Sequence, residues 1–365
     1  MKRRSCALLA WLLVAARVAG SSQPAPVELA AEGRQPQAAV SADGAVAVVY
    51  GTPASDTAPG RVLCRVSADG GKTFAPAVEI ARVEGLALGM RRGPRIAFAG
   101  ATLVVLAISH GNGNLWAWRS TDRGTTWSAP TKVNDVEKSA VEGMHALASD
   151  GGTLLATWLD GRTKGTKIYA ARSMDGGVTW SKNVKVYASP DGHTCECCAP
   201  AASPDGKGGF AVLWRNWLKG SRDMWLASSA DGGRTFGKAR KLGVGTWPLD
   251  GCPMKAGTLA PEPNGRLLTL WEREGTLYEC SPGGTERSLG EAGQPWAASG
   301  PGGVYRVWKA GETIRLVAPG AAPADLGRGA WPVVASAPSG APLVAAWQSP
   351  GNAGGVVVAV MRELH

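Results

Sequence analysis

The sequence has a low share of charged residues and no apolar run long enough to cross a membrane. Charged residues make up 19% of the 365 residues, below the usual quarter, which excludes a long charged tail or a coiled coil. No basic cluster is interleaved with aromatics, so we expect no nucleic-acid partner despite the formal net charge of +10. The hydrophobic fraction of 44% is sufficient to fill a globular core.

The N-terminus has the pattern of a secretory signal peptide. Basic residues at positions 2–4 precede an apolar run over residues 6–16, which is shorter than the roughly 20 residues of a membrane span. We expect residues 1–20 to be removed and residues 21–365 to form a single exported domain, periplasmic or secreted, without a transmembrane segment. Removal leaves 35 basic against 29 acidic residues, a formal net charge of +6.

One eight-residue pattern occurs four times. Each copy reads Ser-x-Asp-x-Gly-x-Thr followed by Phe or Trp, and the aspartates are Asp69, Asp122, Asp175 and Asp231. An aspartate in a turn can accept backbone N–H bonds, and glycine supplies a positive φ. The pattern resembles the Asp-box, or BNR, repeat of sialidase-like β-propellers. We expect these aspartates to stabilise turns.

A second periodic element continues beyond the Asp-boxes. A short strand, a glycine turn and a strand ending in an aromatic recur at 37–50, 95–109, 145–158, 200–214, 254–271, 296–308 and 332–347. The last unit has only three strands, and residues 27–30 can supply its fourth. We predict an all-β fold, a single β-propeller of seven four-stranded blades closed by an N-terminal strand. The sialidase resemblance implies six blades as the alternative.

Blade topology assigns loops to two faces of the ring. The loops that lead into the innermost strands and those that follow the second strands share one face, which we call the mouth. The Asp-boxes follow third strands and belong to the opposite face. We expect a ligand site at the mouth, where the innermost strands converge.

The mouth loops contain an unusual set of cysteines. Cys195, Cys197 and Cys198 precede the innermost strand of one unit, and Cys252 occupies the position of Cys198 in the next unit. The predicted ligand set adds Met254, His145 and His193. Sulfur ligands suit Cu(I), and several cysteines with a histidine equally suit Zn(II). Structural disulfides or a redox-active pair are the alternatives, because an exported protein meets an oxidising compartment. Cys64 and Cys280 lie in non-neighbouring units, so we expect them to be free buried thiols.

The resemblance to sialidases implies a different chemistry. That family clamps a substrate carboxylate with three arginines and uses a tyrosine nucleophile and an acidic acid/base. Arg95, Arg215 and Arg273 are the candidate clamp, with Arg162 as a further arginine. Glu272 and Asp160 are the candidate acids. No tyrosine falls in a mouth loop beside a glutamate.

Two function classes therefore follow. The first is a binding or accessory propeller, monomeric, with a small molecule, a glycan or a copper or zinc ion at its mouth. The second is an exo-sialidase-type glycoside hydrolase acting on terminal anionic sugars. The cysteines occupy the expected place of a catalytic pocket, which favours the first.

Overall fold

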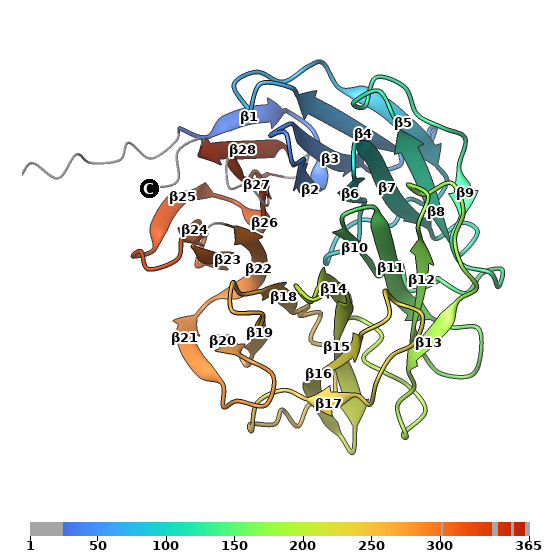
Figure 1. The fold of residues 1–365 in the computed structure, drawn as a ribbon, viewed down its shortest axis with the longest axis vertical. Helices are drawn as coiled ribbons and strands as arrows, with labels where there is room; N and C mark the ends of the chain where they lie inside the picture. Colours follow the sequence, from blue (N-terminus) through green and yellow to red (C-terminus); the bar gives the residue numbers. More distant parts are fainter. Residues whose placement is uncertain (1–24, 301, 338–341, 352–353, 362–365) are drawn as a thin grey trace, which may run out of the picture.

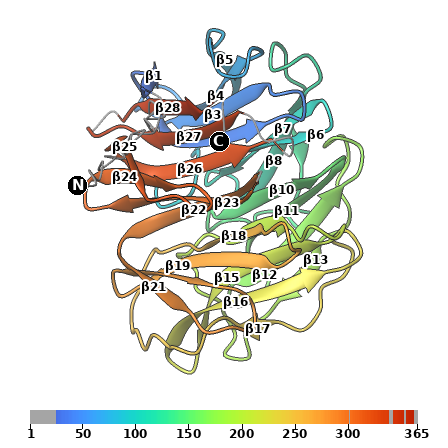
Figure 2. The same ribbon diagram turned by 60° about the vertical axis from the view of Figure 1, so that its left-hand side comes forward.

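The structure, a computed structural model, describes residues 25–300, 302–337, 342–351 and 354–361. The predicted signal peptide lies outside them. Within the described residues, 28 strands form seven four-stranded antiparallel sheets that surround one axis (Figures 1 and 2). The prediction of seven blades is confirmed, and the alternative of six is wrong. In the described part of the chain no helix is long and apolar enough to cross a membrane.

The strands follow one another outward within each blade, and their bounds are as follows. Blade 1 contains β2 (Arg34–Val40), β3 (Val46–Thr52), β4 (Gly60–Ser67) and β5 (Val78–Val83). Blade 2 contains β6 (Arg95–Ala99), β7 (Thr102–Ser109), β8 (Asn114–Ser120) and β9 (Thr131–Lys132). Blade 3 contains β10 (His145–Asp150), β11 (Thr153–Asp160), β12 (Lys167–Ser173) and β13 (Val184–Tyr187). Blade 4 contains β14 (Ala201–Pro204), β15 (Phe210–Leu218), β16 (Ser221–Ser229) and β17 (Arg240–Lys241).

The later blades have the same order. Blade 5 contains β18 (Thr258–Pro261), β19 (Leu267–Arg273), β20 (Thr276–Cys280) and β21 (Arg287–Glu291). Blade 6 contains β22 (Gly293–Gly300), β23 (Gly303–Ala310), β24 (Thr313–Val317) and β25 (Ala324–Arg328). Blade 7 contains β26 (Ala330–Ser336), β27 (Leu343–Gln348), β28 (Val356–Met361) and, outermost, β1 (Val27–Ala30).

The core lies between blades. Second strands such as β3 are buried along their whole length, and their Val, Ala and Leu residues contact sheets on both sides. Each of the seven large clusters of buried apolar side chains combines residues of two adjacent blades. Trp158, Trp214 and Trp347, at the ends of second strands, are at most 1% exposed and fill these interfaces.

The ring is closed by the N-terminal strand, as predicted. β1 pairs antiparallel with β28, and Leu29 is buried in a cluster that joins blade 7 to blade 1. Because β1 pairs with β28, blade 7 has four strands like the other blades, and β28 is not left as an unpaired edge.

The four Asp-box turns follow the third strands β4, β8, β12 and β16. In the first, Asp69 accepts bonds from the backbone N–H groups of Lys72 and Thr73 and from the Ser67 and Thr73 hydroxyls. Gly71 has a φ of 79°, and a Cβ there would lie 2.7 Å from Val360 of the preceding blade. Each turn therefore uses its own carboxylate and needs a glycine where it touches its neighbour.

Candidate functional site

A cavity of about 410 Å³ follows the ring axis and is lined by the innermost strands of all seven blades. Most of its lining is Ala, Ser, Val and Pro, and of the predicted catalytic residues only Arg95 contributes to it. The axis of the propeller thus holds a largely apolar cavity.

Arg91 crosses the ring on its mouth face and is not one of the residues that line the cavity. Its guanidinium donates to the carbonyls of Pro332, Gln294 and Pro295 at 3.0, 2.7 and 3.2 Å, so the loop before β6 reaches blades 6 and 7. It also lies over the ring of Trp296 at 5.1 Å. Burial lowers the pKa of Arg91 to about 9. This residue was not among the predicted site residues, although its loop position at the mouth was a usable signal.

Arg95 holds the same loop from within. The side chain is 4% exposed and donates to the carbonyls of Arg91, Gly93 and Pro94. Burial lowers the pKa of Arg95 to about 10. The Nη1 and Nη2 groups of Arg95 are hydrogen-bonded to main-chain oxygens, and its Nε has no hydrogen-bond partner.

The other predicted clamp arginines also have internal partners, in separate blades. Arg215 donates to the carbonyls of Lys255, Arg222 and Glu272 at 3.1, 2.7 and 2.7 Å. Arg273 forms an ion pair with Glu286 at 3.0 Å. The structure does not bring Arg95, Arg215 and Arg273 together on one free surface.

The two candidate acids are engaged as well. The Glu272 carboxylate pairs with Lys255 at 2.8 Å and is largely buried. Asp160 is fully buried and accepts bonds from Trp158 Nε1 at 2.7 Å and from Arg162 Nε at 2.8 Å.

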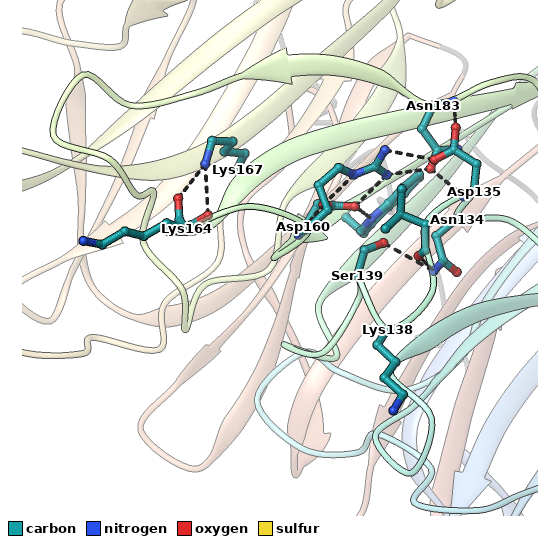
Figure 3. Close-up of polar contacts among 12 residues, drawn as sticks. Asn134, Asp135, Lys138, Ser139, Asp160, Lys164, Lys167 and Asn183 are labelled. Carbon is teal, nitrogen blue, oxygen red and sulfur yellow. Dashed lines mark hydrogen bonds and ion pairs between the residues drawn. The ribbon is translucent and has the colours of Figure 1, made fainter.

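Arg162 forms a wider network around Asp160. Its guanidinium contacts Asp160, Asp135 and Asn183, which lie side by side in Figure 3. The guanidinium also stacks on the ring of Tyr169 at 4.0 Å. This geometry ties the loop before β10 to the turn after β11.

The predicted cysteines meet at the mouth between blades 4 and 5. Cys195, Cys197 and Cys198 have their Sγ atoms within 4.8 Å of one another. Cys195 Sγ lies 3.3 Å from Cys198 Sγ and 3.7 Å from Cys197 Sγ. Cys197 forms a disulfide with Cys252 of the next blade, 55 residues away, with a Cα–Cα distance of 6.1 Å. We call these four residues the cysteine site; it lies beside the axial cavity, whose walls are other residues.

Exposure varies steeply across the cysteine site. Cys195 is 0% exposed, Cys198 1% and Cys197 8%, whereas Cys252 is exposed. The disulfide therefore links the buried thiols to the molecular surface.

Charged and polar donors surround the two free thiols. Arg222 Nη1 lies 3.2 Å from Cys195 Sγ, and the backbone N–H of Lys255 lies 3.3 Å from Cys198 Sγ. The hydrogen bond between the Cys195 and Cys198 sulfurs, together with Arg222 and Arg215, lowers the pKa of Cys195 despite its burial. Burial and the neighbouring Cys195 sulfur raise the pKa of Cys198. Ionisation of this pair is therefore favoured at Cys195 and disfavoured at Cys198.

Arg222 was missed by sequence reasoning. It pairs with Trp217 in the β15–β16 hairpin, which projects from the mouth of blade 4. Because that hairpin follows a second strand, its basic residue could have been assigned to the mouth from blade topology alone.

The remaining predicted ligands are His145, His193 and Met254, and neither histidine belongs to the cluster of three sulfurs. His145 is fully buried in blade 3, its Nε2 lies 3.4 Å from the Leu106 carbonyl, and burial lowers its pKa to about 3. His193 stacks on Trp217 at 4.6 Å and lies 3.6 Å from Glu196. Met254 is 43% exposed.

Cys64 and Cys280 are buried free thiols, as predicted. Burial raises the pKa of Cys64 to about 12 and also raises that of Cys280. They offer the same functional group as the cysteine site without a second sulfur, and serve as internal controls.

Comparison with known proteins agrees with the fold. Residues 93–270, from the loop before β6 into β19, match the family model of the BNR repeat-like domain. These residues therefore carry a BNR repeat-like domain within the seven-bladed propeller. No curated protein matches its sequence.

Among solved structures, three enzymes are similar to this chain. The α-L-arabinanase of Penicillium chrysogenum, complexed with arabinobiose, is 16% identical with a TM-score of 0.55 over 93% of this chain and 98% of that one. The GH93 α-L-arabinofuranosidase of Fusarium graminearum, with arabinobiose, is 15% identical with a TM-score of 0.52 over the same shares. The NanB sialidase of Streptococcus pneumoniae is 12% identical with a TM-score of 0.49 over 93% of this chain and 70% of that one. At these identities the likeness shows the fold alone.

Proposed function

We propose that this propeller is an exported binding or accessory protein whose cysteine site takes a soft metal ion, Cu(I), on Cys195 and Cys198. The observation that carries the proposal is the buried contact of 3.3 Å between their two Sγ atoms. Thiolates are soft ligands and select Cu(I), and two thiols in contact can converge on one ion.

The surrounding charge supports a bound anionic complex. Two thiolates with one Cu(I) carry a net charge of −1, and an isolated buried charge is costly. The guanidinium of Arg222, 3.2 Å from Cys195 Sγ, offsets that charge. Arg215 adds a second cation nearby.

The disulfide favours copper over zinc. Structural zinc takes four protein ligands in tetrahedral geometry. With Cys197 and Cys252 bonded to each other, two thiols remain at the cysteine site. Disulfides also persist mainly in oxidising compartments, which supports the export that the N-terminal pattern predicts.

A competition titration tests the proposal. Metal-free protein is titrated with Cu(I) in the presence of a chromophoric Cu(I) chelator. We expect one equivalent of copper to be withdrawn from the chelator, and Cys195→Ser and Cys198→Ser to lose this binding. Cys64→Ser and Cys280→Ser remove buried thiols elsewhere and should bind as the parent does. Equal copper retention by all four variants would exclude the cysteine site as the ligand.

The glycoside hydrolase alternative has a separate test. A clamp needs guanidinium donors that are free to meet a carboxylate in a bidentate way. Those of Arg95, Arg215 and Arg273 are engaged with main-chain oxygens or Glu286. We expect no release of fluorophore from a fluorogenic sialoside; release that Arg95→Ala abolishes would instead establish the hydrolase.

A further inference from the structure

The four cysteines form a connected row of sulfurs that leads from the interior to the surface. Cys195 Sγ touches both its thiol partner Cys198 and the disulfide sulfur of Cys197, at 3.3 and 3.7 Å. Cys252, the other half of that disulfide, is exposed. A disulfide that only joins two blades has no need of a free thiol pair in contact with it.

We propose that the cysteine site is a thiol–disulfide relay, which passes two electrons from the buried Cys195–Cys198 pair through Cys197–Cys252 to a disulfide of another molecule. This activity is additional to metal binding and does not require it. The acceptor is defined by its chemistry, a disulfide that can reach Cys252 at the surface.

The first internal step is an exchange at Cys197. The Cys195 thiolate attacks Cys197 Sγ, a Cys195–Cys197 bond forms, the Cys197–Cys252 bond breaks, and Cys252 leaves as a thiolate. Arg222, 3.2 Å from the attacking sulfur, stabilises its thiolate form.

The second internal step completes the transfer. Cys198 gives up its proton and attacks Cys195 Sγ, a Cys195–Cys198 bond forms, and Cys197 leaves and takes the proton. The buried pair is oxidised by two electrons and the pair Cys197 and Cys252 is reduced, without an outside oxidant.

The outer step occurs at the surface. The Cys252 thiolate attacks the acceptor disulfide and displaces one acceptor thiolate, and Cys197 then attacks Cys252 Sγ and releases the second. The Cys197–Cys252 disulfide is restored and the acceptor is reduced to two thiols. A dithiol reacting in the reverse sequence recharges the buried pair.

The stepwise mechanism allows the intermediate to be trapped. In Cys198→Ser the relay stops after the first step, so a Cys195–Cys197 disulfide and a free Cys252 thiol accumulate. In Cys195→Ser the first step cannot occur and Cys252 stays paired. Metal-free protein is quenched in acid and denaturant, free thiols are alkylated, and the disulfides are mapped by mass spectrometry.

We expect Cys252 to be alkylated in Cys198→Ser. In Cys195→Ser we expect Cys252 to remain in its disulfide and not to be alkylated. Each parent molecule should contain one of the two disulfides, Cys195–Cys198 or Cys197–Cys252, because the two pairs exchange. Cys252 that remains paired in Cys198→Ser, as in Cys195→Ser, would overturn the relay. Circular dichroism of both variants checks that they fold.

A second measurement applies to the unmodified protein and to a folded control. An aromatic disulfide that releases a coloured thiol is added to the native, metal-free chain. Colour should form with the parent and with Cys64→Ser and be lost in Cys195→Ser. Colour from Cys195→Ser equal to the parent would contradict the relay while leaving copper binding to its own titration.

Discussion

The arginines and the cysteines of the mouth differ in what their side chains contact. Each clamp candidate is bound by groups of its own scaffold: Arg215 donates to three main-chain carbonyls, and Arg273 pairs with Glu286. The thiols of Cys195 and Cys198 instead contact each other and the neighbouring disulfide. A residue type suited to a reaction is therefore weak evidence until its partners are known, and only the cysteines keep reactive atoms directed at one another.

The largest stability effect expected from a change at the cysteine site is that of reducing its disulfide. A bridge closing 55 residues contributes about 4 kcal/mol in the chain-entropy model. For a folded chain of this size that corresponds to a fall in Tm of roughly 6 °C. We expect a cooperative transition to persist in reductant, measured by scanning calorimetry, because the closed ring and its inter-blade core remain. Unfolding at room temperature in reductant would show that the disulfide, not the ring, holds the fold.

The main-chain contacts of Arg215 should contribute to the stability of the fold. Arg215→Met leaves three carbonyl groups without their charged donor, so we expect a loss of about 3 kcal/mol in the free energy of unfolding. Chemical denaturation measures it. Arg123→Met, which removes an exposed pair with Asp43, is the matched control and should change stability by less than about 0.5 kcal/mol. An Arg215→Met protein with the same free energy of unfolding as the parent would contradict this prediction and would favour a role for Arg215 in ligand binding.

The smallest effect concerns the charge on Cys195. Its pKa is lowered to about 6, so the ultraviolet absorbance of the metal-free protein should show a thiolate step near that pH. Arg222→Met should move the step up by about one pH unit, and Cys195→Ser should remove it. A step unmoved by the loss of Arg222 would mean that this guanidinium does not stabilise the thiolate.

The same group gives a signed dependence of stability on pH. The folded-state pKa of Cys195 lies below the ordinary thiol value of about 8.5, so its ionisation adds stability that is complete above that value. The contribution is lost as the pH falls through about 6. The difference in Tm between the parent and Cys195→Ser should therefore grow as the pH rises from about 6 to about 8.5. A constant deficit would contradict it.

Most of the fold could be predicted because its signals are local and repeated. Strand, glycine turn and aromatic recur seven times, and the spare strand at Val27–Ala30 has one place left to pair. The gathering of cysteines from two blades followed from the alignment of innermost strands. The pairing of Cys197 rather than Cys198 with Cys252 did not, because adjacent residues point in different directions that the alignment does not resolve.

The contacts of long side chains were the least predictable part. Arg91 reaches blades 6 and 7 from the loop before blade 2, more than 200 residues away in sequence. Such a contact forms only in the assembled ring, and no repeated pattern in the sequence predicts it. The same applies to Arg222, whose neighbour Cys195 belongs to the loop before β14.

The seventh sheet has a consequence for how the chain is made. Its outermost strand, Val27–Ala30, is synthesised before the other strands of the propeller, and the strand it joins, Val356–Met361, is synthesised after them. Blades 1 to 6 can assemble in order, but Val27–Ala30 must wait for the final segment before it has a partner. The circle is completed only after Val356–Met361 has been synthesised, so a truncated product that lacks this strand would expose two incomplete blade faces to other chains and is the form most prone to aggregate.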